Sequence, residues 1–390
     1  MSSRIKSCTL YYDAVLTDPH YLRCKINGKN PYDEKVMSMP QLHTLLPHSY
    51  ISEHVCLPYK TGVYFFFIYN LENYYHFLYD TLPYLNFYFS LSPRPTLLVE
   101  KDHKFLKFQK EMLLLLGILE KDIEYATDAT YEHLYVPTSL THGQLINGAN
   151  ASNYPPDALA YKVWGKLNES VYYSLPTPKK FYVSRRSYIH GDSSNIGTNY
   201  TTRRRCINEN AVVELVKSYG YEEVFCEIMS TEQKIATFKN ATHIIGFIGG
   251  GMANTLFSPG SVKVGTILTP EFNKINTRFV HCMNHCKLSM LDITDLAPYT
   301  GIFPLFTRVQ IKDKCSALFD KIGEVHACED GKYSVHVSPN VIAGFSLDAS
   351  LIVSEFYESQ LMPLDGGLNS PFVCNITALK NYLDAESKDV

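Results

Sequence analysis

Short apolar runs alternate with stretches of helical periodicity in the first part of the chain. Residues 63–69 predict a strand, 74–89 a helix, 96–99 a second strand, and 103–116 a second helix that ends at Gly117. Strands that alternate with helices favour parallel sheets, because each parallel return to the sheet needs a crossover connection. The pattern therefore predicts an α/β unit here.

A second series of strands and helices follows residues 174–180, whose two prolines and charges mark a linker. The predicted strands lie at 181–183, 223–225, 243–245 and 262–268, and the predicted helices at 209–219 and from the capping box at Ser230 onward. This order is typical of a Rossmann-like unit, which binds ligands at the carboxyl ends of its strands. We expect domains at 1–175 and 176–305, followed by an extension at 306–390 with a turn at 329–331.

A cluster of glycines follows the predicted strand at 243–245. The sequence Gly-Phe-Ile-Gly-Gly-Gly-Met-Ala-Asn fills residues 246–254, and glycines at a strand end let backbone N–H groups approach a ligand closely. A helix start there favours negative charge, so we expect a phosphate to bind at Gly249, Gly250, Gly251 and Met252, with Asn254 beside it. The spacing is not that of a dinucleotide or ATP loop, which disfavours an oxidoreductase.

Two arginine clusters come at the same predicted edge of this sheet. One follows the strand at 181–183 and the other precedes the helix at 209–219: Arg185, Arg186; Arg203, Arg204, Arg205, then Asn208 and Glu209. Guanidinium groups suit bidentate recognition of a diphosphate, so we expect these clusters to bind one together with the glycine turn. A solvated basic loop is the alternative. The polar loop at 191–202, with Asp192, predicts a lid.

The first half offers a second candidate site, at His76 and Asp80. The two residues are four apart on a predicted helix and so share one face, with Asn73 one turn earlier. A neutral imidazole or a carboxylate can take a proton from an acceptor hydroxyl. We therefore expect His76 or Asp80 to be a catalytic base, with Asn73 and Tyr79 on the acceptor side. The alternative is a structural pair.

Residues 281–286 repeat His and Cys at a spacing of four, which suits a metal on a helix. No partner pair stands at a standard spacing, so packing of an amphipathic helix is the favoured interpretation. We also find no Asp-x-Asp on a strand end to hold a divalent cation. The sequence therefore predicts a site that needs no metal.

Composition excludes some classes of partner. The 390 residues include 36 basic and 39 acidic side chains, for a net charge of −3, which predicts no nucleic-acid binding. We see no signal peptide and no run of about 18 apolar residues that would span a membrane. Ten cysteines without a regular framework indicate reduced thiols and a cytoplasmic location.

The order of these pieces resembles glycosyltransferase family 61, which includes plant xylosyl- and arabinosyltransferases and animal O-linked N-acetylglucosaminyltransferases. The resemblance covers about residues 73–290. It rests on three motifs. The family's His followed by Asp and Leu-Pro looks like His76, Asp80, Leu82 and Pro83, and its Arg-Arg followed by Arg and Asn-Glu looks like Arg185, Arg186, Arg205, Asn208 and Glu209. Its glycine turn looks like residues 246–254, with Phe-Ser-Pro-Gly behind them.

The resemblance implies a GT-B architecture, in which two Rossmann-like domains with parallel sheets face each other across a cleft. Together with the candidate residues, it leads us to expect an inverting hexosyl- or pentosyltransferase. Such an enzyme moves a sugar from a nucleotide sugar, UDP-linked, to a glycan or other hydroxyl acceptor, without a cofactor. With no leader in view, we expect a microbial or viral enzyme. Ile248 stands where the family has His, and Gly265 and Thr266 stand where it has an acidic residue. These departures leave a non-catalytic glycan- or nucleotide-binding relative as the alternative.

Overall fold

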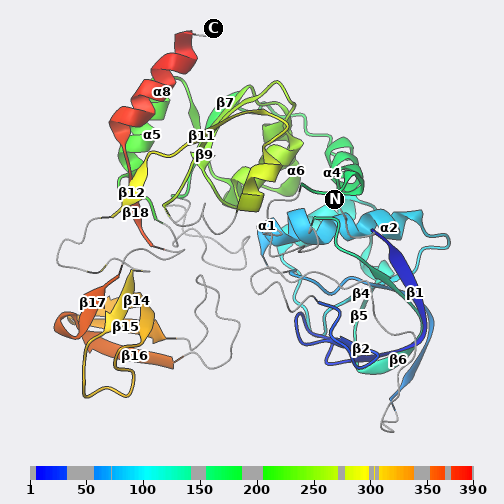
Figure 1. The fold of residues 1–390 in the computed structure, drawn as a ribbon. Helices are drawn as coiled ribbons and strands as arrows, with labels where there is room; N and C mark the ends of the chain where they lie inside the picture. The colour runs from blue at the N-terminus through cyan, green and yellow to red at the C-terminus, as the bar shows by residue number, and fades with distance from the viewer. Residues whose placement is uncertain are drawn as a thin grey trace.

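Two sheets that contain parallel strands, each covered by helices, form most of the molecule, and a third, antiparallel sheet lies to one side of them (Figure 1). The structure is a computed structural model, and it describes residues 6–32, 57–71, 73–141, 155–186, 205–270, 277–297, 303, 307–337, 352–364 and 370–388. The predicted α/β class is therefore confirmed, as a mixed α/β architecture.

The first sheet has the strand order β2-β1-β6-β3-β4-β5. Its strands are β1 (Cys8–Thr17), β2 (Lys25–Ile26), β3 (Tyr59–Phe66), β4 (Thr96–Val99), β5 (Ile123–Tyr125) and β6 (Ala129–Pro137). β3 runs parallel to β4 and β6, and β4 runs parallel to β5, whereas β1 is antiparallel to β2 and β6. The predicted strands at 63–69 and 96–99 correspond to β3 and β4.

The helical segment between β3 and β4 contains three kinds of turn. It consists of α1 (Tyr74–His76), the π-helix η1 (Phe77–Thr81), the 3-10 helix η2 (Leu82–Tyr84) and α2 (Leu85–Ser90). Pro83 lies in the first turn of η2, and because proline has no N–H the hydrogen-bond ladder cannot continue through it unchanged. The predicted helix at 74–89 is present, with a wide π turn of the kind that recurs at functional sites.

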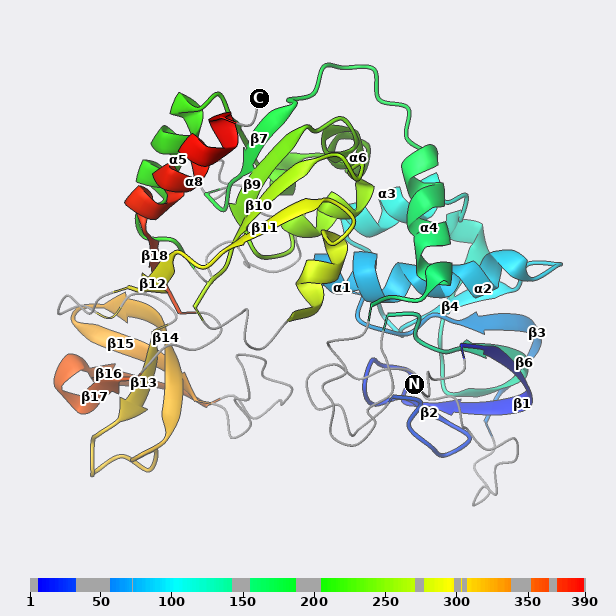
Figure 2. The same ribbon diagram turned by 45° about the horizontal axis from the view of Figure 1, so that its top comes forward.

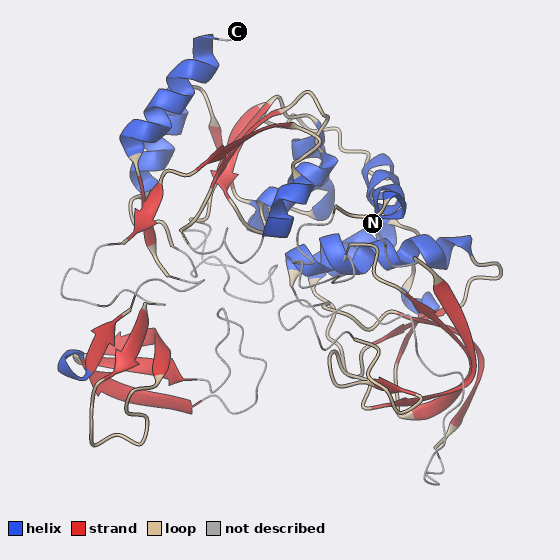
Figure 3. Cartoon of the chain, viewed as in Figure 1, coloured by secondary structure: helices blue, strands red, loops and turns tan. Residues whose placement is uncertain are grey.

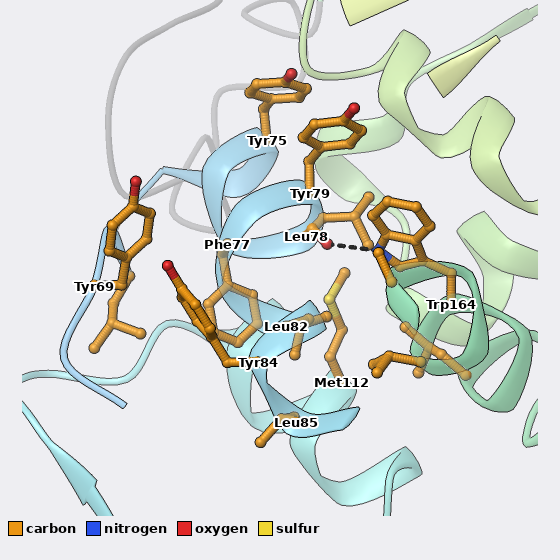
Figure 4. Packing of buried hydrophobic residues seen from close by; sticks show 14 of the residues in the cluster. Tyr69, Tyr75, Phe77, Leu78, Tyr79, Leu82, Tyr84, Leu85, Met112 and Trp164 are labelled. Carbon is orange, nitrogen blue, oxygen red and sulfur yellow. Dashed lines mark hydrogen bonds between the residues drawn. The ribbon is translucent and has the colours of Figure 1, made fainter. Parts of the chain in front are cut away.

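Large aromatic rings hold this segment against the helices α3 (Lys107–Leu115) and α4 (Ala158–Glu169). Tyr75 and Tyr79 lie side by side, with Trp164 of α4 on the other side of Tyr79 (Figure 4). The indole Nε1 of Trp164 donates to the carbonyl oxygen of Leu78 at 2.9 Å. Because that carbonyl belongs to η1, the indole satisfies part of the backbone of the π turn.

The second sheet has the order β11-β10-β9-β7-β8, and all its neighbouring strands are parallel. The chain reaches it from α4 through the predicted linker (Figure 2). Its elements are β7 (Lys180–Val183), α5 (Glu209–Ser218), β8 (Glu222–Val224), η7 (Cys226–Ile228), α6 (Thr231–Lys239), β9 (His243–Phe247), η8 (Met252–Phe257), β10 (Lys263–Ile267), η9 (Thr277–Cys282) and β11 (Lys287–Leu291). The predicted strands and helices of this region are confirmed, and the Ser230 hydroxyl caps α6 by accepting from the N–H of Gln233 at 3.1 Å.

The chain leaves the second sheet after β11 and later returns to it. β12 (Thr294–Leu296) pairs with β18 (Phe372–Cys374), and α8 (Ile376–Lys388) then packs beside α5 (Figure 2). The antiparallel sheet lies between β12 and β18, with the order β16-β15-β14-β13-β17, and contains little helix (Figure 3). Its elements are β13 (Arg308–Ile311), β14 (Ile322–Glu329), β15 (Lys332–Val337), β16 (Ile352–Tyr357), η10 (Glu358–Gln360) and β17 (Leu361–Pro363). Asp330 and Gly331, both with positive φ, form the β14–β15 turn predicted at 329–331.

Candidate active site

His76 and Asp80 lie one turn apart in the helical segment after β3, and their side chains meet. His76 Nδ1 is 2.7 Å from Asp80 Oδ2. His76 keeps 9% of its surface exposed, whereas Asp80 keeps 1%. A substrate would therefore reach the imidazole more readily than the carboxylate, which lies behind it.

Asp80 accepts hydrogen bonds from two further side chains. The Thr141 hydroxyl donates to Oδ1 at 2.6 Å, and the guanidinium of Arg278 contacts both carboxylate oxygens. Arg278 comes from η9, 198 residues further along the chain, and is itself 1% exposed. Asp80 is thus enclosed by charge-assisted bonds that hold it as an anion.

Arg278 lies among aromatic rings. Its guanidinium carbon is 5.2 Å from the centroid of the Tyr79 ring, and the next residue, Phe279, stacks on Tyr75 with centroids 3.7 Å apart. Burial alone lowers the pKa of Arg278, but Asp80, Tyr75 and Tyr79 outweigh burial and raise that pKa above its ordinary value. Arg278 therefore carries a permanent positive charge that ties the second unit, which is the second sheet with its helices, to Asp80 in the first unit, which is the first sheet with its helices.

The sequence reasoning missed Arg278. The residue stands outside the arginine clusters, and its partner lies far away in the sequence, so local patterns do not identify it. The one sign of it in the sequence is that this charged side chain directly precedes the apolar pair Phe279-Val280. A charged residue beside apolar residues can be buried when a counter-ion pairs with it.

The glycine turn follows β9, at the carboxyl edge of the second sheet, as predicted. It leads into η8, so a helix begins here as predicted, in the form of a 3-10 helix of six residues. Ser258 and Pro259 end it at once, so the helix is too short to build a sizeable dipole. Any anion at this turn would depend on individual backbone N–H groups.

Close packing explains two of the glycines. A Cβ atom on Gly251 would lie 2.9 Å from Val183 Cγ1, and one on Gly246 would lie 2.7 Å from Met252 Sδ. Met252 is fully buried and fills the space beside Gly246. Gly250 is different, because nothing lies within 4 Å of where its Cβ would be.

Arg185 lies beside the turn, because a Cβ atom on Gly249 would be 3.0 Å from its Nη1. Glu209 holds the backbone of Arg185 in place: Oε1 accepts from the Arg185 N–H at 2.7 Å and from the Tyr182 hydroxyl at 2.8 Å. Burial raises the pKa of the Glu209 carboxyl above its usual value, against the lowering effect of these donors. The structure thus brings Arg185, Glu209 and the glycine turn together.

Arg186 and Asn208 make contacts away from the turn. Arg186 forms an ion pair with Glu223 of β8, with Nη2 2.7 Å from both carboxylate oxygens. The Asn208 amide pairs with the backbone of Cys374 in β18, donating to its carbonyl at 2.8 Å and accepting from its N–H at 2.9 Å. Both side chains connect elements of the second unit.

Arg205 is exposed, and its carbonyl oxygen accepts from the N–H of Phe372 at 3.0 Å. Arg203, Arg204 and the predicted lid at 191–202, with Asp192, lie outside the described residues. Of the predicted guanidinium groups that the structure describes, it places Arg185 next to the glycine turn.

A second contact joins the helical segment of the first unit to the glycine turn. Tyr74 donates its hydroxyl hydrogen to Asn254 Oδ1, and Asn254 Nδ2 donates to the carbonyl oxygen of Gly251 at 2.9 Å. The Lys234 ammonium of α6, a group the sequence did not single out, lies 4.5 Å from the centroid of the Tyr74 ring. Burial lowers the pKa of Lys234 below its usual value. Asn254 thus bridges the predicted phosphate site and the helix that carries His76.

The two predicted acceptor-side residues have clear structural surroundings. Asn73 caps α1, where its Oδ1 accepts from the N–H of His76 at 3.2 Å. Tyr79 is fully buried between Tyr75 and Trp164. The hydroxyl groups of Tyr75 and Tyr79 are buried without a hydrogen-bond partner in the described part of the chain.

Residues 281–286 do not form the predicted amphipathic helix. η9 ends at Cys282 and β11 begins at Lys287, so residues 283–286 form the turn between these two elements. His285 Nε2 lies 2.9 Å from the carbonyl oxygen of Ser258, so its ring supports the end of η8. Over the described ranges, no group of three His, Cys, Asp or Glu side chains could hold a metal ion, and the nine described cysteines are free thiols.

The two departures from the family pattern occupy core positions. Gly265 lies in the middle of β10, where the Tyr382 hydroxyl of α8 would be 2.9 Å from a Cβ atom. Gly265 and Thr266 therefore lie inside β10 and not after its end, which is where we expect the acidic residue of the family. Ile248 is fully buried, and its N–H donates to the carbonyl oxygen of Ile267 at 2.9 Å.

Comparison with known proteins identifies the class. Residues 74–265 match the family model described as Glycosyltransferase 61. This match supports the assignment of these residues to glycosyltransferase family 61 and therefore a glycosyltransferase, a class whose substrates are a sugar donor and an acceptor. The match begins at the first residue of α1 and ends within β10, so it contains His76, Asp80 and the glycine turn but not Arg278.

No curated protein matches the chain. Among the described residues, no helix is both long and apolar enough to cross a membrane.

Proposed function

We propose that the protein is an inverting GT-B transferase that moves a hexose or pentose from a UDP-sugar to a hydroxyl group of a glycan acceptor. The donor diphosphate binds at Arg185 and Gly249–Gly251, and the acceptor hydroxyl binds at His76. One observation carries the proposal: the segment that holds His76 touches both the glycine turn, through Tyr74 and Asn254, and η9, through Asp80 and Arg278. The proposed base and the proposed phosphate site therefore belong to one connected structure.

His76 is the better candidate for the base. Asp80 already accepts from Thr141, Arg278 and His76, so its oxygens are engaged. A carboxylate bonded to Nδ1 fixes the imidazole tautomer with its proton there, which leaves Nε2 free of a proton and able to take one from the acceptor. In this proposal Asp80 is a positioning residue, and Arg278 keeps Asp80 charged.

The donor side supplies positive charge without a metal in this proposal. As the sugar leaves the diphosphate, negative charge grows on the bridging and terminal phosphate oxygens. Arg185 and the backbone N–H groups of the glycine turn can stabilise that charge because Glu209 and Asn254 hold them in fixed positions. In an inverting reaction the acceptor oxygen attacks the anomeric carbon on the face opposite the diphosphate, and His76 accepts the hydroxyl proton.

The test uses the purified full chain with a panel of UDP-sugars and hydroxyl acceptors, and measures release of UDP and the anomeric configuration of the product. We expect turnover with inversion, and His76→Gln should lower kcat by about 10²–10⁴-fold while leaving UDP binding unchanged. His133→Gln, on β6, is the matched control and should keep full activity. Absence of turnover and of UDP binding across the panel, or a His76→Gln variant with normal kcat, contradicts the proposal.

Binding of the donor can be tested separately. Arg185→Gln should weaken UDP binding by about tenfold or more, because it removes a charge-assisted bond to phosphate. Arg94→Gln changes an exposed arginine that lies 5.5 Å above the Phe89 ring in the first unit, and should leave UDP binding unchanged. UDP binding without turnover by any donor would instead support a non-catalytic nucleotide-binding relative.

A further inference from the structure

The first unit contains a cavity that takes no part in the proposed transfer reaction. It lies between α3, the loops on both sides of α3, and β5, and its volume is about 520 Å³. β5 is the edge strand of the first sheet, so this cavity follows the flank of the sheet. Its size is within the range of small-molecule sites.

Apolar side chains make up most of the wall of this cavity. Five of them are aliphatic, and the rings of Phe105 and Tyr125, with centroids 6.4 Å apart, complete the set. Leu114 is 62% exposed, Leu119 42% and Tyr125 47%. Exposed apolar groups that cluster around one hollow mark a binding site, because leaving them in water is unfavourable. Aliphatic groups offer no hydrogen bonds to a sugar or a nucleotide, so the chemistry fits a hydrocarbon chain.

The rim of the cavity favours an anion. Lys104 and Lys110 line it together with Glu120, and none of the ion pairs found among the described residues includes either lysine. Two neighbouring carboxylates are already paired: Glu111 with Lys107, at 3.9 Å, and Glu124 with Lys60, at 3.0 Å. The rim therefore has an excess of positive charge.

We propose that this cavity binds a single-chain lipid with an anionic head group. The alkyl chain lies against the aliphatic wall between α3 and β5, and the head group lies between Lys104 and Lys110. This inference is independent of the transfer reaction, because it uses no residue of the proposed donor or acceptor site.

The first test is calorimetric titration of the full chain with alkyl phosphates, each below its micelle concentration. We expect decyl phosphate to bind about tenfold more tightly than octyl phosphate, because two more methylene groups leave water. Dodecyl phosphate should bind more tightly than the uncharged dodecyl maltoside, and inorganic phosphate should not bind measurably. Affinity that does not depend on chain length, or equal affinity for the charged and uncharged amphiphiles, overturns the proposal.

Variants test the location of the site. Lys104→Glu and Lys110→Glu should each weaken dodecyl phosphate binding by about threefold or more, whereas Lys162→Glu, an exposed change on α4, should not. Leu114→Gln should weaken binding of every chain length, and its exposed position keeps the fold intact, which a thermal melt checks. Unchanged affinity in all three cavity variants, or binding of an acidic peptide along β5 in place of the alkyl phosphates, contradicts the proposal.

Discussion

Replacing Asp80 with asparagine is expected to destabilise the protein by about 3–5 kcal/mol, because it leaves the buried guanidinium of Arg278 without its counter-charge. Arg278 and Asp80 are each 1% exposed, so water cannot take the place of the lost carboxylate. Thr141→Val removes one hydrogen bond to the same carboxylate, and should cost about 1.5–3 kcal/mol. The two variants thus separate the contribution of the ion pair to stability from that of the hydrogen bond.

A double-mutant cycle isolates the pair. Arg278→Met alone leaves the Asp80 carboxylate buried without its guanidinium counter-charge. It should therefore lower the free energy of unfolding by about as much as Asp80→Asn does. The double variant removes both charges, so it should cost less than the sum of the two single changes, by about 2 kcal/mol or more. The exposed pair Lys380–Asp384, with 2.7 Å between Nζ and Oδ2, is the matched control and should show little coupling energy.

Urea unfolding gives the free energies directly. The chain has one tryptophan, Trp164, which packs against Tyr79 beside Arg278, so its fluorescence reports this region. Equal m-values across the series would show that the variants unfold from comparable states. Single changes that add to within about 0.5 kcal/mol would refute the reasoning, because Asp80 and Arg278 would then not interact. That result would also contradict the argument that a charged Asp80 orients His76.

Three further predictions concern the second unit and its contact with α1. Tyr74→Phe removes the hydrogen bond between α1 and the glycine turn, so it should lower the free energy of unfolding in urea by about 1 kcal/mol. It should also lower kcat more than it raises the KM for the donor. Gly251→Ala should cost about 1–3 kcal/mol, since its Cβ meets Val183 at 2.9 Å, whereas Gly250→Ala should be nearly neutral. The raised pKa of Glu209 predicts that stability falls as pH rises from about 4.5 through that pKa, and Glu209→Gln should flatten this dependence in unfolding at several pH values.

Local signals explain which elements the sequence predicts. β7, β9 and β10 are short apolar runs buried on both faces, and the Ser230 cap fixes the start of α6. The pairing of His76 with Asp80 also follows from local spacing. β1 is not visible in this way, because its partner β6 lies far along the chain and joins Cys8 to Pro137.

Contacts between residues far apart in the sequence also explain which parts of the site the sequence does not predict. Arg278 meets Asp80 across 198 positions, and no periodicity in either segment encodes that contact. The arginine clusters predict a shared role, yet the structure directs Arg186 to Glu223 and Arg185 to Gly249. Two adjacent side chains on a strand end point to opposite sides, so spacing alone could not show which one reaches the turn.

Among the described residues, hydrogen-bonding side chains join the helical segment of the first unit to the second unit at two positions six residues apart, Tyr74 and Asp80. Two contacts of different kinds, a neutral hydrogen bond to Asn254 and a buried ion pair to Arg278, restrict both the distance and the rotation of His76 relative to the glycine turn. A hydrogen bond is the weaker of the two, so its loss should loosen the donor side while the ion pair still orients the imidazole. Loss of the ion pair should instead disturb stability and base together. The different effects of Tyr74→Phe and Asp80→Asn on kcat and on unfolding therefore distinguish a preorganised base from a residue that merely packs between the units.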